Sequence, residues 1–214
     1  MAGYKAHLAT GMVVGVISVA GALVSAAITP SYIPIVFIAV IIGSFLPDLD
    51  SDTGLPVKIL FSILGLLGSI ITFYMLKDDF RAELLRFLAL IAGCYGFIYL
   101  ILQRIFKSFT THRGIFHSII ALFISMLALN VLLLYLQIEI LEAGIISLSL
   151  GVGYFGHLLL DEINAVVNLS GLPFIPNKSL GTALKLVSKS KRVNMGAIVI
   201  FITLVCLNFV LILS

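Results

Sequence analysis

Long apolar runs separated by short polar segments dominate the chain. At about 1.5 Å of rise per residue, roughly 20 apolar residues form a helix that crosses the hydrocarbon core of a bilayer. The longer runs cover residues 8–28, 55–76, 84–102, 115–136 and 195–213, and a further run begins at Ala143. These runs predict helices that span a membrane.

One run, residues 35–46, is short for a membrane span and ends at Pro47, which cannot continue a helix. It fits either a short crossing helix completed by flanking residues or a re-entrant segment. With this run included, the chain is expected to form an all-α polytopic transmembrane helical bundle of about seven spans.

The composition agrees with this class. Of the 214 residues, 61% are hydrophobic and 11% are charged, whereas soluble domains are about half apolar and about a quarter charged. The length suits one bundle, so residues 1–214 are expected to form a single membrane-embedded domain. The formal net charge of +3 is too small to indicate a nucleic-acid partner. Cys94 and Cys206 lie within apolar runs, which argues against a disulfide or a cysteine-rich zinc site.

The longest polar segment, at about residues 164–194, is expected to lie at the cytoplasmic surface of the membrane. Within it, apolar residues repeat at helical spacing and lysines occupy another face. This pattern predicts a helix that lies on the bilayer. The apolar set is Leu180, Ala183, Leu184 and Val187, and the lysines are Lys185 and Lys189.

The cations divide unevenly when the runs are threaded as seven alternating spans. One side receives Lys5, Lys58, Arg104, Lys107, Arg113, Lys178, Lys185, Lys189, Lys191 and Arg192, and the other receives Lys77, Arg81 and Arg86. Short cytoplasmic loops carry an excess of Lys and Arg, so the first side and the N-terminus are expected in the cytoplasm. The same side receives His7, Asp48, Asp50, His112, His117, His157 and Asp161.

His157 and Asp161 lie four residues apart at the end of an apolar run. On a helix this spacing is about 400° of rotation, so both side chains project from one face. An imidazole and a carboxylate placed in this way can share one metal ion. They can also form a buried polar pair that joins two helices. We favour the ligand interpretation, because ionisable residues inside a membrane usually have a function.

Asp48 and Asp50 flank Leu49 in a segment that Pro47 keeps out of a helix. In an extended chain alternate residues face the same way, so both carboxylates can point to one site. Two adjacent carboxylates repel unless a cation lies between them or one is protonated. The pair is therefore expected to bind a divalent ion, although a solvated loop or a helix N-cap would explain it as well.

His112 and His117 enclose Arg113 and Gly114 just before an apolar run. Five residues on a helix turn by about 140°, so these imidazoles converge only if His112 lies in the loop and His117 in the first helical turn. Gly114 would allow the required bend. The planar fork of Arg113 matches phosphate or carboxylate, which predicts an anion clamp. An anchor at the lipid headgroups is the alternative for this arginine.

His7 precedes the first run and has the weakest individual case, since a lone histidine at a helix end is often a capping or interfacial residue. Taken together, however, four histidines and three aspartates exceed the ligand set of one tetrahedral ion. Two ions bridged by a carboxylate such as Asp50 would use the whole set. Imidazole and carboxylate ligands suit zinc best here, with manganese or iron as alternatives.

Four stretches of the sequence occur in the order typical of the YdjM-like family of bacterial and archaeal inner-membrane proteins, which the chain resembles. They are His7, residues 43–50 (GSFLPDLD), residues 112–118 (HRGIFHS) and residues 156–161 (GHLLLD). Metal-dependent hydrolysis is attributed to this family, which is distantly similar to zinc-dependent phospholipase C. The phospholipase pattern uses an N-terminal tryptophan as a ligand, and this chain contains no tryptophan.

The resemblance implies a metal-dependent hydrolase that cleaves a phosphoester of a membrane lipid or a lipid-linked substrate at the cytoplasmic face. It implies metal ligation by His7, Asp48, Asp50, His112, His117, His157 and Asp161. From the residues themselves, Arg113, Asp50 and His117 are the expected catalytic residues, Arg113 as the anion clamp and the other two as essential ligands. A divalent-cation or proton transporter is the main alternative. Transporter sites, however, usually lie near the middle of the membrane on broken helices. A scaffold protein, in which the metal only holds the helices together, is the third possibility.

Overall fold

The structure of the chain is a computed structural model, which describes residues 4–25, 27–50, 55–76, 84–109, 114–166, 184–186, 188 and 190–213. Within these ranges the chain is helical apart from short turns and one isolated bridge pair, so the all-α prediction is confirmed. The α-helices are α1 (Tyr4–Val24), α2 (Ile33–Phe45), α3 (Leu55–Leu76), α4 (Leu84–Gly96), α5 (Gln103–Phe109), α6 (Ile119–Tyr135), α7 (Ile140–Val166) and α8 (Lys191–Leu213). Shorter helical segments are η1 (Pro30–Tyr32), η2 (Leu46–Asp50) and the π-helical η3 (Phe97–Leu102).

The described helices confirm a polytopic bundle, but the short helix is not the one expected. The second run extends through η1 and η2 into a helical stretch of 20 residues, Pro30–Leu49, that is long and apolar enough to cross a membrane. Five further helical stretches meet the same criterion, and α6 is a shorter apolar helix of 17 residues. The run 115–136 yields a short helix because Ser118 adopts an extended conformation (φ −149°, ψ 154°) and caps α6.

The chain separates into two compact units. The first comprises residues 1–47 and 113–214 and therefore holds α1, α2, α6, α7 and α8. The second comprises residues 48–112 and holds α3, α4, η3 and α5. The single domain expected from the sequence stays a prediction.

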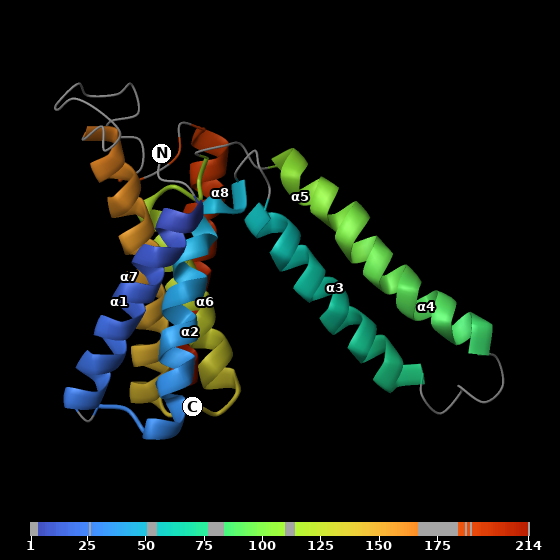
Figure 1. Ribbon diagram of the computed structural model, residues 1–214, viewed down its shortest axis with the longest axis horizontal. Helices are drawn as coiled ribbons and strands as arrows, with labels where there is room; N and C mark the ends of the chain where they lie inside the picture. The colour runs from blue at the N-terminus through green and yellow to red at the C-terminus, as the bar shows by residue number, and fades with distance from the viewer. Residues whose placement is uncertain are drawn as a thin grey trace. The chain divides into compact units, whose positions relative to one another are not determined.

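Helix α7 lies at the centre of the first unit. It packs against α2, α6 and α1, while α6 also packs against α8 (Figure 1). The start of α1, the end of α2, the start of α6 and the end of α7 lie at one end of this bundle (Figure 1). Residues near these four helix ends can therefore meet, although they are far apart in the sequence.

Two glycines bring the backbones of α2 and α7 together. A Cβ atom at Gly153 would lie 2.0 Å from the carbonyl oxygen of Val40, and one at Gly43 would lie 2.0 Å from that of Leu150. No side chain fits at either distance, so this packing requires glycine at both positions. The close approach also carries the carbonyl group of Ser44, next to Gly43, towards the last turns of α7.

The second unit is a helical hairpin. Helix α3 packs along α4 and η3, and the hydroxyl groups of Ser62 and Tyr95 lie 3.0 Å apart across the pair. A Cβ atom at Gly65 would lie 2.8 Å from the ring of Tyr95, so the two helices are in close contact there. Asp48 and Asp50 belong to this unit, at its N-terminal end.

The surface helix predicted within residues 164–194 is not seen where the structure describes that segment. Residues 184–186 are not helical. The carbonyl oxygens of Lys185 and Leu186 instead accept hydrogen bonds from the amides of Ile119 (2.9 Å) and Ile120 (3.3 Å). The first amides of a helix have no acceptor within their own helix, and these two carbonyls supply one for α6. The rest of the predicted helix, including Leu180, Ala183, Val187 and Lys189, lies outside the described residues.

Candidate metal centre

Four ionisable side chains meet at one end of the first unit. His7 is the fourth residue of α1, His117 lies in the turn before α6, and His157 and Asp161 belong to α7. All four are almost fully buried, with at most 2% of any residue exposed. Sequence analysis placed each of them among the metal ligands, and the structure brings these four together.

Asp161 lies at the centre of the cluster. Its Oδ1 atom lies 3.4 Å from His7 Nε2, and its Oδ2 atom lies 3.7 Å from His117 Nε2. Each carboxylate oxygen therefore faces a different imidazole. His157 stands one helical turn before Asp161, as the spacing of four residues predicts, and its ring stacks on that of His7 with centroids 3.7 Å apart. His117 approaches the same ring edge-on, at 5.7 Å.

The distances in the cluster are those of ligand pairs. Hydrogen bonds between nitrogen and oxygen measure about 2.7–3.2 Å, and both contacts of Asp161 are longer. Two ligands of one tetrahedral ion, with bonds of about 2.1 Å, lie roughly 3.4 Å apart. His117, His157 and Asp161 each offer a ligand atom within 4.8 Å of the others. These three residues can therefore hold a divalent cation such as zinc, and His7 Nε2 lies 3.4 Å from the same carboxylate.

The backbone of α2 fixes the tautomer of His157. Its Nδ1 atom lies 2.7 Å from the carbonyl oxygen of Ser44. A carbonyl oxygen only accepts, so Nδ1 carries the hydrogen and Nε2 keeps the lone pair. Metal-binding histidines usually donate their second nitrogen to such an oxygen, which orients the ring and makes it a better ligand. The glycines that bring α2 against α7 thus also place the carbonyl oxygen that orients His157.

A short turn, rather than a helix, holds His117. The residue lies immediately before the N-cap Ser118 and not in the first turn of α6 as expected. Ser118 Oγ accepts from the amide of Ala121 (3.4 Å) and donates to the carbonyl group of Ile115. The hydroxyl group of Tyr154 donates to the carbonyl group of Phe116. The residues on either side of His117 are therefore anchored, one to α6 and one to α7.

Tyr154 is a functional candidate that sequence analysis missed. It is fully buried and packs with Leu158, Ala121 and Leu122 beneath the cluster. It lies three residues before His157 and seven before Asp161, so the helical period places all three on one face of α7. This spacing was the available signal.

The other predicted site residues stay predictions. His112 and Arg113 lie outside the described residues, as does the side chain of Asp50. Asp48 is half-buried in η2 and belongs to the second unit. The four residues brought together in the first unit form the His/Asp cluster of the discussion below.

The fold and this cluster define a class: multi-pass membrane proteins with a buried group of histidine and aspartate side chains able to hold a metal ion. The chain matches the YdjM inner membrane protein family over residues 1–213 and belongs to that family. This match confirms the resemblance found in the sequence and identifies a multi-pass inner membrane protein. No curated protein matches the chain, and no solved structure does.

Proposed function

We propose that this protein is a membrane-embedded, metal-dependent hydrolase that cleaves a phosphoester of a lipid or a lipid-linked substrate at the cytoplasmic face. The observation that carries the proposal is the gathering of three buried imidazoles around Asp161. Those of His7 and His117 lie 3.4 and 3.7 Å from its oxygens, and His157 offers a ligand atom within 4.8 Å. A buried set of this kind is costly in a membrane without a compensating cation.

His7, His117, His157 and Asp161 would hold the ion, with zinc as the first candidate and manganese or iron as alternatives. A divalent ion supplies Lewis-acid chemistry towards a phosphoryl oxygen and activates water near neutral pH. The remaining predicted ligands, Asp48, Asp50 and His112, would allow a second ion. Arg113 is assigned to a non-bridging oxygen of the substrate, because its fork matches phosphate.

The cytoplasmic placement rests on the asymmetry of charge. Ten Lys and Arg residues fall on the side of the cluster and three on the other side when the seven helices are threaded through a bilayer. The N-terminus would be cytoplasmic and the C-terminus extracytoplasmic. Labelling a single cysteine at Ser214 from outside, after replacement of Cys94 and Cys206, tests this orientation. Protection at Ser214 together with labelling near Asp79 would contradict it.

Transport is the second class of function, and the position of the cluster counts against it. His7 is the fourth residue of α1, and His117 lies two residues before α6 begins. The ligands thus gather at helix ends, whereas transporter sites usually lie near the midplane. A purely structural ion is the third class, and it leaves Arg113 without a role.

The test combines metal analysis with a screen of phospholipids and phosphoesters. The wild-type protein should contain a divalent ion and cleave at least one substrate, while His117→Ala and Asp161→Asn should lose both. Asn164→Ala is the matched control, because among the described residues this α7 side chain donates to Leu160 of its own helix (2.8 Å) and to no cluster residue. Metal-free wild-type protein would overturn the proposal, and bound metal without any hydrolysis would favour transport or a scaffold.

Arg113 separates substrate binding from metal binding. Arg113→Ala should keep the ion but lower kcat/KM by about 100- to 1000-fold, the usual effect of removing one contact to transition-state charge. Arg113→Lys should restore little of this loss, because an ammonium group does not reproduce the bidentate fork. Asp50→Asn, by contrast, should lower metal content and turnover together.

A further inference from the structure

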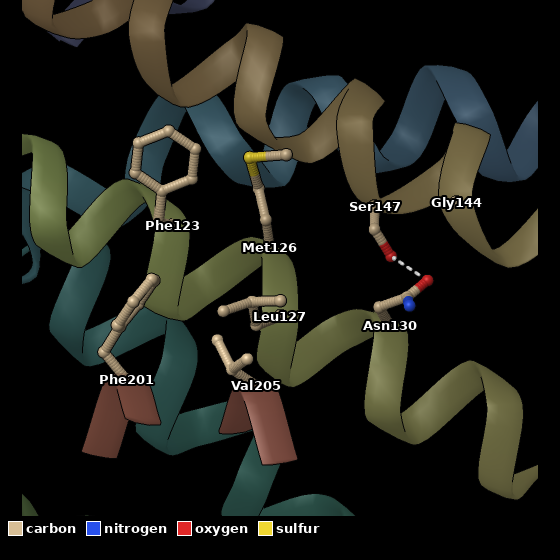
Figure 2. A pocket seen from close by; sticks show the side chains of 8 residues that line it. All are labelled: Phe123, Met126, Leu127, Asn130, Gly144, Ser147, Phe201 and Val205. Carbon is tan, nitrogen blue, oxygen red and sulfur yellow. Dashed lines mark hydrogen bonds between the residues drawn. The ribbon is translucent and has the colours of Figure 1, made fainter. Parts of the chain in front are cut away.

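A hollow lies among α6, α7 and α8 of the first unit, on the side away from α1 and α2. Its volume is about 310 Å³. Figure 2 shows Phe123 and Met126 of α6 directed towards α7, with Leu127 of α6 beside Val205 of α8 and Phe201 on the same side as Val205. Phe123 and Val205 remain 46% and 42% exposed, so the hollow opens onto the outer surface of the bundle. In an inner membrane protein this surface faces lipid.

One end of the hollow is closed by a polar network. Ser147 Oγ donates to Asn130 Oδ1 (3.3 Å), and Asn130 Nδ2 donates to Asn208 Oδ1 (2.7 Å) (Figure 2 shows the first bond). The amide nitrogen of Asn208 donates to the carbonyl oxygens of Leu127 and Leu204, at 3.1 and 2.8 Å. These polar groups bond to one another and to the backbone, so an occupant need not supply hydrogen bonds. The network also ties three helices together at this point.

The hollow and the His/Asp cluster lie at different depths along the same helices, α6 and α7. Ser147 lies ten residues before His157 in α7, which is about 15 Å along a helix. Phe123 is the fifth residue of α6, so the hollow begins about 6 Å from the N-terminal end of α6, which His117 precedes. Half of a hydrocarbon core of about 30 Å is also about 15 Å. A chain that begins at the depth of the cluster and reaches the middle of the bilayer would thus span the depth of the hollow.

The size and lining select a hydrocarbon chain over other occupants. A helix with its side chains is about 10–12 Å across, too wide for a space of about 310 Å³. That volume holds roughly ten groups the size of a water molecule, at about 30 Å³ each. Water would find few polar partners on these walls. A row of methylene groups satisfies both limits, because it is narrow and needs no hydrogen bond.

We propose that this hollow holds an acyl or prenyl chain of the lipid substrate, whose phosphoester lies at the His/Asp cluster. The assignment of the chain to the substrate rests on the proposed hydrolytic function. The binding of a hydrocarbon chain does not, since it follows from the shape and lining of the hollow. The protein would then recognise its substrate at two points. The phosphoester would be recognised by its charge, and the hydrocarbon tail by its volume.

A tryptophan introduced into the hollow reports occupancy directly. The natural chain contains no tryptophan, so Phe201→Trp gives fluorescence from this place alone, and Phe123→Trp is a second reporter in case the first does not fold. The probe is phosphatidylglycerol with brominated acyl chains, titrated into detergent-solubilised full-length protein. Bromine quenches tryptophan at short range, and we expect quenching that saturates and is reversed by the unbrominated lipid.

Two glycines provide a filling variant and its matched control. A Cβ atom at Gly144, in the wall of the hollow, meets no atom within 4 Å, and the same holds at Gly196 of α8, which does not line it. Gly144→Leu should therefore fold and occupy part of the space, weakening the lipid by about tenfold or more, since each buried methylene contributes to binding. Gly196→Leu should leave the affinity unchanged. Equal quenching in both variants, quenching that never saturates, or none in either reporter would overturn the site.

Turnover distinguishes the substrate chain from a structural lipid. Gly144→Leu should lower kcat/KM for a long-chain substrate about tenfold or more, and should leave a short-chain analogue of the same headgroup unchanged. Equal loss on both would overturn the assignment to the substrate, while saturable quenching would still establish a bound hydrocarbon chain. If the wild-type protein cleaves no phosphoester, the assignment fails together with the proposed function, and the quenching alone decides what the hollow binds.

Discussion

Two of the polar groups that the first unit buries are built differently. The His/Asp cluster joins α1, α7 and the turn before α6, whereas the network of Ser147, Asn130 and Asn208 joins α6, α7 and α8. In the network the polar atoms lie 2.7–3.3 Å apart, which is the range of hydrogen bonds or close to it. In the cluster the carboxylate lies 3.4 and 3.7 Å from its imidazoles.

The difference shows that burial of polar groups in a membrane does not by itself indicate a function. Amide and hydroxyl groups carry both donors and acceptors, so three of them can satisfy one another without any ligand. A carboxylate offers acceptors alone, so it has no hydrogen to donate to the lone pairs of the three imidazoles beside it, whereas a cation binds both. The network therefore serves helix association, and the cluster is the candidate for a bound cation.

The largest effect is expected at His157. His157→Ala removes a ligand and should reduce metal binding to background, because the remaining side chains no longer surround the ion. Asn208→Ala, which breaks the network, should leave the metal content at the wild-type level. Inductively coupled plasma mass spectrometry of the purified proteins measures both. Loss of metal in the Asn208 variant would show that the network also supports the cation site.

Chelation should destabilise the protein through the cluster alone. At a free metal concentration of about 100 times the dissociation constant, bound metal contributes roughly 2.7 kcal/mol. For a chain of this size that energy corresponds to a shift in Tm of about 5–10 °C. Thermal unfolding in detergent should show this decrease for the wild-type protein and for Asn208→Ala, and none for His157→Ala. A decrease of similar size in the His157 variant would mean that the chelated ion lies elsewhere.

Tyr154 should affect the metal affinity of the cluster indirectly, through the turn that carries His117. Tyr154→Phe deletes the hydrogen bond to the carbonyl group of Phe116 and loosens the turn that carries His117. Loss of an outer partner typically lowers metal affinity about 10- to 100-fold. Titration with a competing chelator measures this change. A stability decrease with unchanged metal affinity would assign Tyr154 to packing alone, and Tyr99→Phe, in the second unit, is the control for loss of a tyrosine hydroxyl group.

The sequence predicts much of the fold, because apolar runs of span length become helices whatever their neighbours. It does not predict the short α6. Ile115 and Phe116 belong to the apolar run but lie in a turn, and only the tertiary contacts of Ser118, Tyr154 and Lys185 reveal this. The second run looked too short for the opposite reason, since the helical turns at its two ends contain prolines.

Part of the candidate site could also be predicted from the sequence. The spacing of His157 and Asp161 places both on one face of α7, which is a local property of any helix. His7 had the weakest individual case, yet it is 2% exposed and stacks on His157. Its role depends on the packing of α1 against α7, and no periodicity within either helix specifies that pairing. The tautomer of His157 is likewise set by a distant backbone oxygen, that of Ser44.

The smallest effect is expected in the polar network, where it tests whether the amides stabilise the bundle. A double-mutant cycle of Asn130→Leu and Asn208→Leu should give a coupling energy of about 0.6–1.7 kcal/mol, the range for hydrogen bonds between membrane helices. The value stays small because amides released by unfolding within a membrane also find other partners. Unfolding in mixed detergent micelles measures it. Thr203→Val is the matched control on α8, since that exposed hydroxyl group donates only to Val199 of its own helix (2.9 Å). A coupling energy near zero would mean that the two amides do not meet in the bilayer, and a simultaneous loss of metal would join two groups that the structure separates.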